Sequence, residues 1–457
     1  MNQSSQDLAS GSIPKLLAQL AVPAVIAQVV NLLYNIVDRI YIGHIAEIGA
    51  AALTGVGLFT PILMLLNAFA MLAGAGGAPL AAIALGQKDH EKAEKIAGNC
   101  FTVLLIFAVA LTAVFYISAP WLLRLFGASD STLPYAADYS RIYILGTVCI
   151  LIVMGMNPFI TTQGFAKVSM MTTLIGAVIN IILDPIFIFA FHLGVRGAAI
   201  ATVLSQAVGA VWILRFLTSE KSIIRLRRCN LRLEGSIILP CLGLGISTFV
   251  MLSTESLLSI TFTSSLSHYG GDLAVGAMTI ITSVSQLVTL PLQGICQGGQ
   301  PLISYNYGAG LDDRVRKTFF CVLRTCMIYT ILFCIAVLLF PAAFAGIFTA
   351  DAQLTDYTAW AMRIYMAGIF ACGAQISCQQ SFMALGQAKV SLLLACLRKL
   401  ILLIPLILIL PRLLPAAPVL AVFLAEPISD IAAAAITTIT FLSKFNGILA
   451  KGAHPSD

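Results

Sequence analysis

The chain has 457 residues, of which 59% are hydrophobic and only 10% are charged, and its formal net charge is +6. A soluble domain carries roughly 25% charged residues, so this composition excludes an ordinary soluble enzyme and predicts a protein solvated by lipid. Apolar runs of about 20 residues recur along the chain, each long enough to cross a hydrocarbon core of roughly 30 Å. Because no water satisfies backbone groups there, we expect these runs to be helices.

The expected helices form two sets of six. In chain order they cover 16–42, 49–75, 94–117, 134–158, 168–190 and 196–218, and then 236–264, 272–298, 318–341, 358–384, 391–411 and 416–443. We therefore expect a terminal segment 1–15, a first lobe 16–218, a basic linker 219–235, a second lobe 236–443 and a tail 444–457. The first fifteen residues lack the basic cluster and short apolar core of a signal peptide.

Basic residues gather in the segments that would lie on one side of the membrane. If both termini are cytoplasmic, the inner loops and tails hold about 16 Lys and Arg residues, and the outer loops hold about 3, Arg124, Arg196 and Arg412. This asymmetry follows the positive-inside rule and predicts that both termini are cytoplasmic. Topology thus accounts for the positive net charge, and no nucleic-acid partner is expected.

Cysteines and enzyme motifs give no sign of catalysis. The 11 cysteines are scattered without a C-x-x-C pair, mostly inside apolar runs, where cysteine behaves as a small hydrophobic residue. The sequence contains no H-E-x-x-H, no G-x-S-x-G and no phosphate-binding loop, and its five histidines fall near expected loops. We therefore expect neither an enzyme nor a protein-bound cofactor, and we expect no ATP-driven transport by this chain.

The two halves of the chain repeat. The motif Gly-Gly-x-Pro-Leu occurs at 76–80 and at 298–302, and the segments 164–169 and 386–391 also match, both at an offset of 222 residues. An even number of helices in each half makes both halves enter the membrane from the same side. We therefore expect two bundles related by a pseudo-twofold axis along the membrane normal, with a central cavity between them. At the Gly-Gly-x-Pro-Leu motifs, close local packing is favoured over ligand binding.

Several segments carry a resemblance to a known family. They are Tyr34–Asp38, Asn180–Pro185, Gly299–Gly308 and Glu426–Asp430. Together they resemble the multidrug and toxic compound extrusion (MATE) transporters over nearly the whole chain, with the last segment closest to the MepA-like bacterial branch. The resemblance implies export of small amphipathic, mostly cationic organic compounds in exchange for H+ or Na+ by alternating access. It also implies a multi-pass protein of the prokaryotic cytoplasmic membrane.

The first expected helix carries an acidic residue at membrane depth. An ionisable side chain there costs a few kcal/mol and so needs a partner or a function. Asp38 ends a polar stripe with Gln28, Asn31 and Asn35, and the spacings of 3, 4 and 3 residues place the stripe on one helix face. Tyr34 borders this stripe.

The fifth expected helix carries a second acid. Asp184 shares a helix face with Asn180, and Thr202 of the sixth expected helix is available to add a hydroxyl group. Pro185 lacks the backbone N–H that would bond to the carbonyl of Ile181, which leaves a further oxygen beside the carboxylate.

Two carboxylates that face one apolar enclosure cannot both stay charged without a partner. Either one binds a proton or a cation lies between them, and both states suit a coupled exchanger. The alternative is that each acid only completes a helix break or bonds to a neighbouring helix. The resemblance favours the first interpretation, since the matching positions lie at the family's cation site. The expected coupling residues are Asp38, Asn35, Asn180, Asp184 and Thr202, with Na+, where it is the coupling ion, held by Asp38, Asn180, Asp184 and Thr202.

The second half does not duplicate these acids. At the same offset Leu406 replaces Asp184 and Leu402 replaces Asn180. The charged residues expected inside helices are instead Glu255, Arg398, Lys399, Glu426 and Asp430. Either the basic pair neutralises Glu426 or Asp430 in a buried cluster, or an acid binds a cationic substrate or a second proton. The cluster is favoured for Asp430, and both interpretations stay open for Glu255 and Glu426.

Polar residues are expected to line the central cavity if the repeat geometry holds. The candidates for substrate binding are Tyr34, Asn31, Glu255, Gln286, Gln379 and Glu426, and further polar residues in the same helices are Thr279, Thr282, Ser283, Gln375 and Gln380. An alternative function is a flippase or exporter of a lipid-linked or other amphipathic metabolite within the same superfamily. A pyrophosphate would require a cationic cavity, whereas the first lobe carries acids. Twelve helices can form a complete pathway, so a functional monomer is expected.

Overall fold

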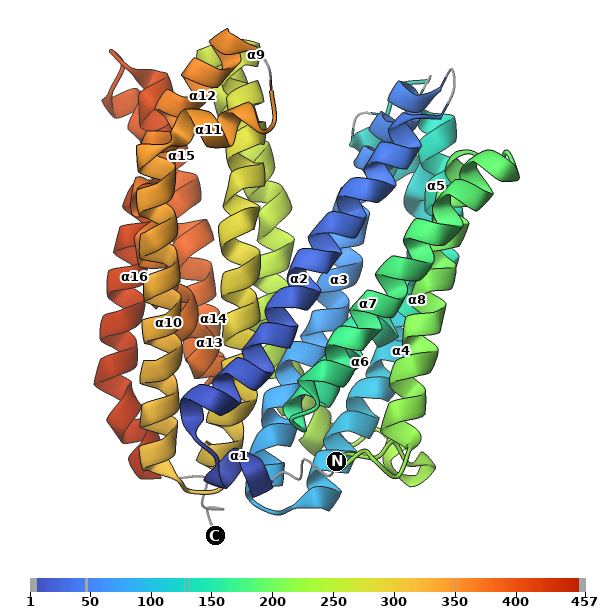
Figure 1. Cartoon of the computed structure of the whole chain (residues 1–457), viewed down its shortest axis with the longest axis vertical. Helices are drawn as coiled ribbons and strands as arrows, with labels where there is room; N and C mark the ends of the chain where they lie inside the picture. Colours follow the sequence, from blue (N-terminus) through green and yellow to red (C-terminus); the bar gives the residue numbers. More distant parts are fainter. Residues whose placement is uncertain (1–5, 46–47, 127, 131, 350, 452–457) are drawn as a thin grey trace.

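The structure is a computed structural model, and it describes residues 6–45, 48–126, 128–130, 132–349 and 351–451. Throughout this part the regular secondary structure is helical, with no strand. Two bundles of long helices lie side by side, the first half of the chain in one and the second half in the other (Figure 1). The bundles diverge at the end drawn at the top and meet at the end drawn at the bottom. We call these the wide end and the narrow end.

The first lobe comprises eight α-helices and one π-helical segment. They are α1 (Gln6–Ser10), α2 (Ile13–Gly43), α3 (Gly49–Gly86), α4 (His90–Leu125), α5 (Leu133–Leu145), α6 (Thr147–Thr162), α7 (Ala166–Pro185), η1 (Ile186–Ala190) and α8 (Val195–Thr218). A connector containing the short 3-10 helix η2 (Arg228–Leu231) leads to the second lobe.

The second lobe repeats this arrangement. Its elements are α9 (Gly235–Gly308), α10 (Asp312–Leu339), α11 (Pro341–Gly346), α12 (Ala352–Tyr365), η3 (Met366–Gly368), α13 (Ile369–Ala384), α14 (Ala388–Cys396), the π-helical segment η4 (Leu397–Leu403), α15 (Ile404–Leu413) and α16 (Pro418–Lys451).

The number of membrane crossings agrees with the expected twelve. Within the described residues nine helices are long and apolar enough to cross a membrane, and α5 with α6, bent by 58°, forms a tenth crossing. The chain reverses inside α9 at Gly271, where φ is 65°, so α9 supplies two crossings. The broken helix α12–η3–α13 covers the remaining expected span. The all-α membrane fold predicted from composition is therefore confirmed.

Element boundaries repeat at the same offset of 222 residues as the sequence motifs. Helices start, break or end at the matched positions Ile13 and Gly235, Gly49 and Gly271, Gly86 and Gly308, His90 and Asp312, Gly146 and Gly368, and Ala166 and Ala388. Gly146 lies between α5 and α6, which are bent by 58°, and the matched Gly368 ends η3 just before α13, so the fourth and tenth expected spans both break at a glycine. These shared breaks were not predicted from the sequence.

Glycine contacts hold the lobes together at the narrow end. A Cβ atom at Gly86 would collide with the carbonyl oxygen of Tyr305, and one at Gly308 would collide with that of Ile83. Only a residue without a side chain allows α3 and α9 to approach this closely. The Gly-Gly-x-Pro-Leu motifs lie inside these two helices, which continue through them to Gly86 and Gly308. They stop neither helix.

The segment before α2 is hydrogen-bonded to the opposite lobe. We call residues 6–12 the N-terminal strap. The guanidinium of Arg314 in α10 donates to the carbonyl oxygens of Leu8 at 3.1 Å and Gly11 at 2.9 Å, and to Asn306 Oδ1 at 3.1 Å. Asn306 Nδ2 in turn donates to the Leu8 carbonyl at 3.3 Å. The strap begins the first half of the chain but is tied to the second lobe.

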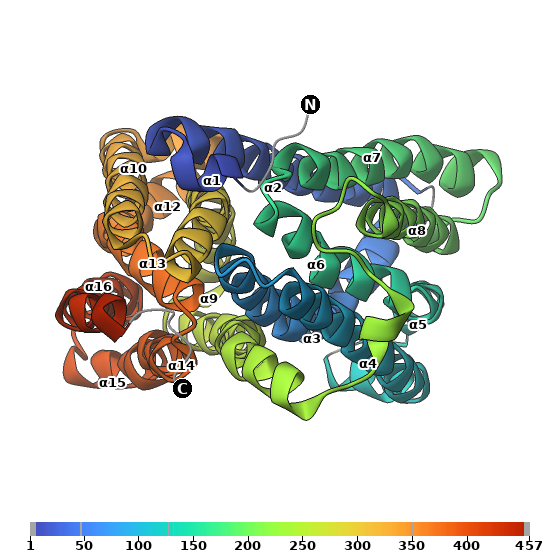
Figure 2. The ribbon, with the colours of Figure 1, turned by 90° about the horizontal axis from the view of Figure 1, so that it is seen from below.

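The connector before α9 shows the reciprocal arrangement. We call residues 219–234 the connector strap. Figure 2, which views the narrow end, shows it running across the first lobe. The side-chain oxygen of Gln163 accepts bonds from the backbone nitrogens of Ile223 at 2.7 Å and Ile224 at 3.0 Å. Asn99 Oδ1 accepts a bond from the backbone nitrogen of Glu234 at 2.7 Å. This strap leads into the second lobe but is tied to the first.

Candidate functional site

A cavity of about 310 Å³ lies between the lobes. Helices α2, α3, α6, α7 and α8 of the first lobe and α9 and α13 of the second supply its walls. Its volume is in the range of cavities that bind small organic molecules. None of the residues that line it carries a formal charge.

Amide side chains are the main polar groups of this cavity. They are Gln28, Asn31, Asn157, Gln206, Gln293, Gln297, Gln300 and Gln380. Gln28 Nε2 donates to Gln297 Oε1 at 3.3 Å and so bridges the two lobes. Methionine and small apolar residues fill most of the remaining wall.

The first-lobe acid site is built on α7 and α8. Asn180 and Asp184 lie one turn apart on α7, which places both side chains on the face toward α8. Asn180 Nδ2 donates to Asp184 Oδ1 at 3.2 Å and to Thr202 Oγ1 at 3.3 Å. The Thr202 hydroxyl donates to the carbonyl of Ala198 at 3.0 Å. Asn180, Asp184 and Thr202 are all buried.

Helix α2 brings Asp38 to this site. The carboxyl groups of Asp38 and Asp184 interact directly. Within the part of the chain that the structure describes, three buried oxygens here have no hydrogen-bond partner: Asp38 Oδ1, Asn180 Oδ1 and Asp184 Oδ2. Leaving a buried polar group unsatisfied costs about 1–3 kcal/mol, more for charged groups. A proton or a small cation bound between the two carboxyls would give their oxygens a partner, which is compatible with the coupling role expected of these residues.

Other residues lie around the acid pair. The amide of Asn35 donates to the carbonyl of Asn31 at 2.6 Å, so this nitrogen turns back along α2 instead of joining Asn180. Tyr34, Tyr139 and Tyr143 are close enough for the charge of Asp38 to act on their phenol groups. Tyr139 and Tyr143, both buried on α5, were not expected from the sequence. Nothing in the spacing of α5 pointed to an acid on another helix.

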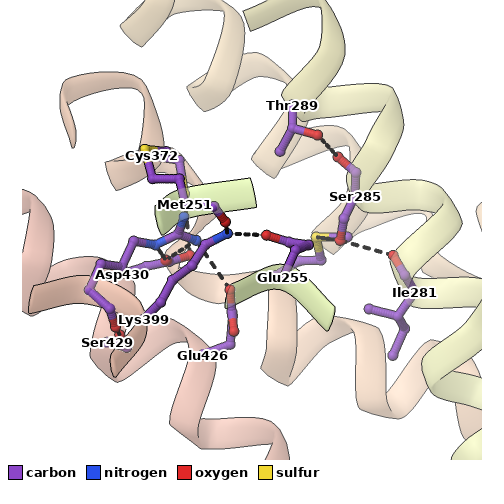
Figure 3. A network of polar contacts seen from close by, with 12 residues as sticks. Met251, Glu255, Ile281, Ser285, Thr289, Cys372, Lys399, Glu426, Ser429 and Asp430 are labelled. Atoms are coloured by element: carbon purple, nitrogen blue, oxygen red, sulfur yellow. Dashed lines mark hydrogen bonds and ion pairs between the residues drawn. The ribbon is translucent and has the colours of Figure 1, made fainter. Parts of the chain in front are cut away.

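The second lobe places its charged residues in one cluster. Arg398 Nε donates to Asp430 Oδ1 at 2.9 Å, and an NH2 nitrogen of the same guanidinium lies 3.2 Å from Glu426 Oε1. Lys399 forms an ion pair with Glu255 and donates to the carbonyl of Met251 at 3.1 Å (Figure 3). Arg398 thus joins α16, whereas Lys399 reaches α9.

The positions of these two bases have a local cause. Arg398 and Lys399 lie in η4, where backbone bonds span five residues instead of four. Pro405 follows two residues after η4 and has no N–H for a regular helical bond. The first lobe has its π-helical segment at 186–190, which is not the position equivalent to η4. The lobes therefore differ in backbone at the point where they differ in charge.

Comparison with known proteins identifies the family. The model of the MatE family matches residues 23–186 and 247–409, which is most of the chain and one match in each lobe. The chain belongs to the MATE family of membrane transporters. It is 24% identical over 387 residues to the "Multidrug export protein MepA" of Staphylococcus saprophyticus, covering 85% of each protein. It is 24% identical to the protein of the same name in Staphylococcus aureus strain N315, covering 84% of each.

Solved MATE structures share the fold. The structure described as "MATE in the bent conformation" superposes with a TM-score of 0.92 at 22% identity and covers 99% of both chains. A structure described as the outward-facing conformation of a multidrug resistance MATE family transporter gives 0.90 at 23% identity, with 98% of this chain and 99% of that chain covered. The predicted membership of the family, and the likeness to its MepA branch, are confirmed.

The MATE cavity separates the substrate-binding candidates into two groups. Asn31 and Tyr34 line it. Glu255, Gln286, Gln379 and Glu426 lie outside its lining. Glu426 is bonded in the charged cluster, and Gln379 accepts a bond from Gln375 at 2.9 Å. Of the further polar candidates, Gln380 lines the cavity.

Sequence reasoning missed four amides of this MATE cavity, Asn157, Gln206, Gln293 and Gln297. A signal for two of them was present, because Gln293, Gln297 and Gln300 follow one another at spacings of four and three, which is one helix face. Such a polar stripe in an apolar span indicates a face turned away from lipid. Gln206 follows Ser205 and lies one turn after Thr202 on α8, so a weaker polar face was also present there.

Proposed function

We propose that this chain is a secondary active exporter of small amphipathic, mostly cationic organic compounds, driven by H+ or Na+ moving inward through the first lobe. The observation that carries the proposal is the group of three unpartnered buried oxygens on Asp38, Asn180 and Asp184. Two interacting carboxyls with no base bonded to them form a site that gains and loses a cation at low cost. The name of the staphylococcal relatives supports export of organic compounds.

The basic residues support one orientation of the chain in the membrane. The narrow end carries the connector strap with Lys221, Arg225, Arg227, Arg228 and Arg232, so the positive-inside rule puts this end, and with it both termini, in the cytoplasm. In this proposed orientation the lobes diverge toward the outside, which is the arrangement of an outward-facing transporter in a prokaryotic cytoplasmic membrane. The single chain encloses the whole cavity, which supports a functional monomer.

Helix α2 connects the coupling site to the cavity. Its lower part packs against the second lobe, where Ala21 lies against Gly298, and its upper part crosses to the first lobe (Figure 1). Asn31 and Tyr34 line the cavity, and Asp38 lies one turn beyond Tyr34. A cation bound between Asp38 and Asp184 therefore acts on the same helix that contacts a substrate. If the cation binds one position of α2 better than another, it shifts the equilibrium between them.

A flippase for a lipid-linked sugar is less well supported. Its phosphate groups would need cationic side chains along the cavity, and no lining residue is charged. Arg398 and Lys399, the two bases within the second-lobe helices nearest to it, are already paired with acids. One solved structure at 22% identity, from Pyrococcus furiosus, is described as having a binding pocket of reverse polarity and a suggested different function. We therefore treat the flippase as an outcome of the following test.

The test is transport into liposomes containing the purified protein. A fluorescent organic cation is followed under an imposed pH gradient and then under a Na+ gradient, for the wild type, Asp184→Asn and Asp130→Asn. Asp130 is a fully exposed acid of the same lobe and serves as the matched control. We expect flux driven by one gradient, lost in Asp184→Asn and kept in Asp130→Asn. Flux that does not respond to either gradient, or that persists in Asp184→Asn, contradicts coupling through this site. The flippase would then be the better supported function.

A further inference from the structure

Equivalent positions around the cavity differ in polarity between the lobes. Four pairs of lining residues are related by the offset of 222: Met71 and Gln293, Ala75 and Gln297, Ala78 and Gln300, and Pro158 and Gln380. In every pair the first-lobe residue is apolar and the second-lobe residue is glutamine. We call the first set the apolar strip, on α3 and α6, and the second set the glutamine strip, on α9 and α13. The two lobes thus place equivalent residues on the cavity wall, but the side chains are apolar in the first lobe and polar in the second.

The amides of the glutamine strip are available to a ligand. Within the described residues Gln293, Gln300 and Gln380 form no hydrogen bond to protein, and Gln297 has Gln28 as its one partner. Other amides of the first lobe come from different positions, and one of them, Asn157, is already bonded to Ser169 and Thr172. Each glutamine offers two N–H donors and one carbonyl acceptor. The strip therefore presents a row of donors and acceptors to the cavity, and three of its four amides have no protein partner within the described residues.

Formal charge is absent from this wall. Arg398 bonds to both Glu426 and Asp430, and Lys399 bonds to Glu255. The acid pair Asp38 and Asp184 also lies outside the cavity lining. The polar edge of a bound molecule therefore meets amides and no carboxylate. Amides select for groups that both donate and accept hydrogen bonds, not for charge.

We infer that the cavity recognises a two-faced ligand whose polar edge is uncharged and bears amide, carbonyl or hydroxyl groups. The apolar face of the ligand packs on the apolar strip, where Met71 adapts to its shape. The polar edge bonds to the glutamine strip. This inference rests on the proposed export function and deepens it by naming the part of the substrate that confers selectivity. A cationic charge elsewhere on the substrate is compatible with binding but does not confer the selectivity.

A site built from unpaired hydrogen-bonding groups discriminates strongly against ligands that lack them. Such a ligand would displace water from the glutamines and leave their amides unsatisfied. An apolar surface, in contrast, discriminates only weakly between ligands of similar size. The glutamine strip should therefore account for most of the difference in affinity between two ligands of similar size.

Equilibrium binding to the purified full-length protein in lipid nanodiscs tests the inference without any ion gradient. The two radiolabelled probes are chloramphenicol, an uncharged aromatic molecule with an amide and two hydroxyls, and tetraphenylphosphonium, an aromatic cation with no hydrogen-bonding group. The variants are Gln293→Met and Gln380→Met, in which a side chain of similar length loses its amide. Gln286→Met is the matched control, since Gln286 lies two turns away on α9 and outside the lining.

We expect Gln293→Met and Gln380→Met each to weaken chloramphenicol binding about tenfold, the loss of one hydrogen bond of about 1.4 kcal/mol. Tetraphenylphosphonium binding should be unchanged or tighter, and Gln286→Met should leave both probes unchanged. Equal losses for both probes, no loss for either, or a wild type that does not bind chloramphenicol would each overturn the inference. If a variant does not fold, Ala75→Gln serves instead, because it places an amide on the apolar strip and should weaken tetraphenylphosphonium selectively.

The outcome is independent of the coupling mechanism. Loss of gradient-driven flux in wild-type liposomes would refute the proposed function while leaving the binding comparison intact. Unchanged chloramphenicol binding in both glutamine variants would refute the two-faced ligand while leaving coupling through Asp184 untouched.

Discussion

The two lobes share a backbone and treat buried charge in opposite ways. In the first lobe, Asp38 and Asp184 interact with each other, and no ion pair joins either to a base within the described residues. In the second lobe, Arg398 lies 2.7 Å from Asp430 and 3.2 Å from Glu426, and Lys399 pairs with Glu255. Many helix boundaries nonetheless repeat at one offset, from Ile13 and Gly235 to Ala166 and Ala388.

This difference shows that the two lobes share close backbone contacts but not the pairing of buried charges. Close contacts such as Gly86 against Gly308 recur because the backbone of both lobes needs them. Charge is not repeated, and an acid that has a permanent cationic partner has little reason to bind another cation. The first lobe is thus suited to exchange a cation, and the second to hold its helices together. The following predictions test this division, from the largest expected effect to the smallest.

Removing either acid of the first lobe should abolish coupling. We expect Asp38→Asn to lower gradient-driven flux by at least about 100-fold, because a cation without differential affinity shifts no equilibrium. Thermal stability should stay the same or rise, since an unpaired buried carboxylate is removed. Flux assays and thermal unfolding of the same preparation measure both effects. A variant that loses flux only in proportion to its folded fraction would contradict the division.

Removing the base of the second-lobe cluster should act on stability instead. Arg398→Met leaves Glu426 and Asp430 buried without a cation, and we expect a loss of about 3–5 kcal/mol in the free energy of unfolding. Thermal unfolding in detergent measures this loss. The matched control is Arg412→Met, which removes an exposed arginine near the end of α15 and should have little effect. A stable Arg398→Met protein with altered ion coupling would assign an exchange role to this lobe as well.

The Lys399–Glu255 pair should contribute less than Arg398. The Glu255 side chain is 50% exposed, whereas Glu426 and Asp430 are buried, and Lys399 keeps its bond to the Met251 carbonyl when Glu255 is changed. A double-mutant cycle of Glu255→Gln and Lys399→Met should give a coupling energy of about 1 kcal/mol or less. A coupling energy several times larger would show that the pair is desolvated in the membrane. The quantity measured is the midpoint of thermal unfolding for all four proteins.

The smallest effect is expected at the N-terminal strap. Arg314→Ala removes hydrogen bonds to Leu8 and Gly11 and should expose residues 6–12 to hydrogen exchange about tenfold more, without changing global stability by more than about 1 kcal/mol. Lys317→Ala on the same helix, an exposed lysine, is the control. Gln163→Ala should loosen the connector strap to a similar degree. Unequal responses of the two straps would reveal a further difference between the lobes.

Much of the fold was predictable from the sequence, and part of the site. The membrane crossings follow from apolar length, and the repeat follows from two motifs with one offset. Asp38 and Asp184 could be recognised because an acid in an apolar helix is rare. The partner of Glu255 could not, because lipid and protein interior are equally apolar, so periodicity does not say which helices face each other. The helix breaks at Gly146 and Gly368 left no sequence signal, since glycine is also frequent in continuous membrane helices.

The N-terminal strap and the connector strap have a consequence for the rate at which the narrow end opens. The N-terminal strap continues into the first lobe and is hydrogen-bonded to the second, whereas the connector strap joins α8 to α9 and its bond from Glu234 to Asn99 holds the start of α9 at the first lobe. Both sets of bonds therefore resist separation of the narrow end. Their bonds act in parallel across one gap, and their energies add in the barrier to opening. Every 1.4 kcal/mol in that barrier changes the opening rate about tenfold. Substitutions in the straps should therefore change how long the protein dwells in this state, and hence its turnover rate, while its choice of substrate stays the same.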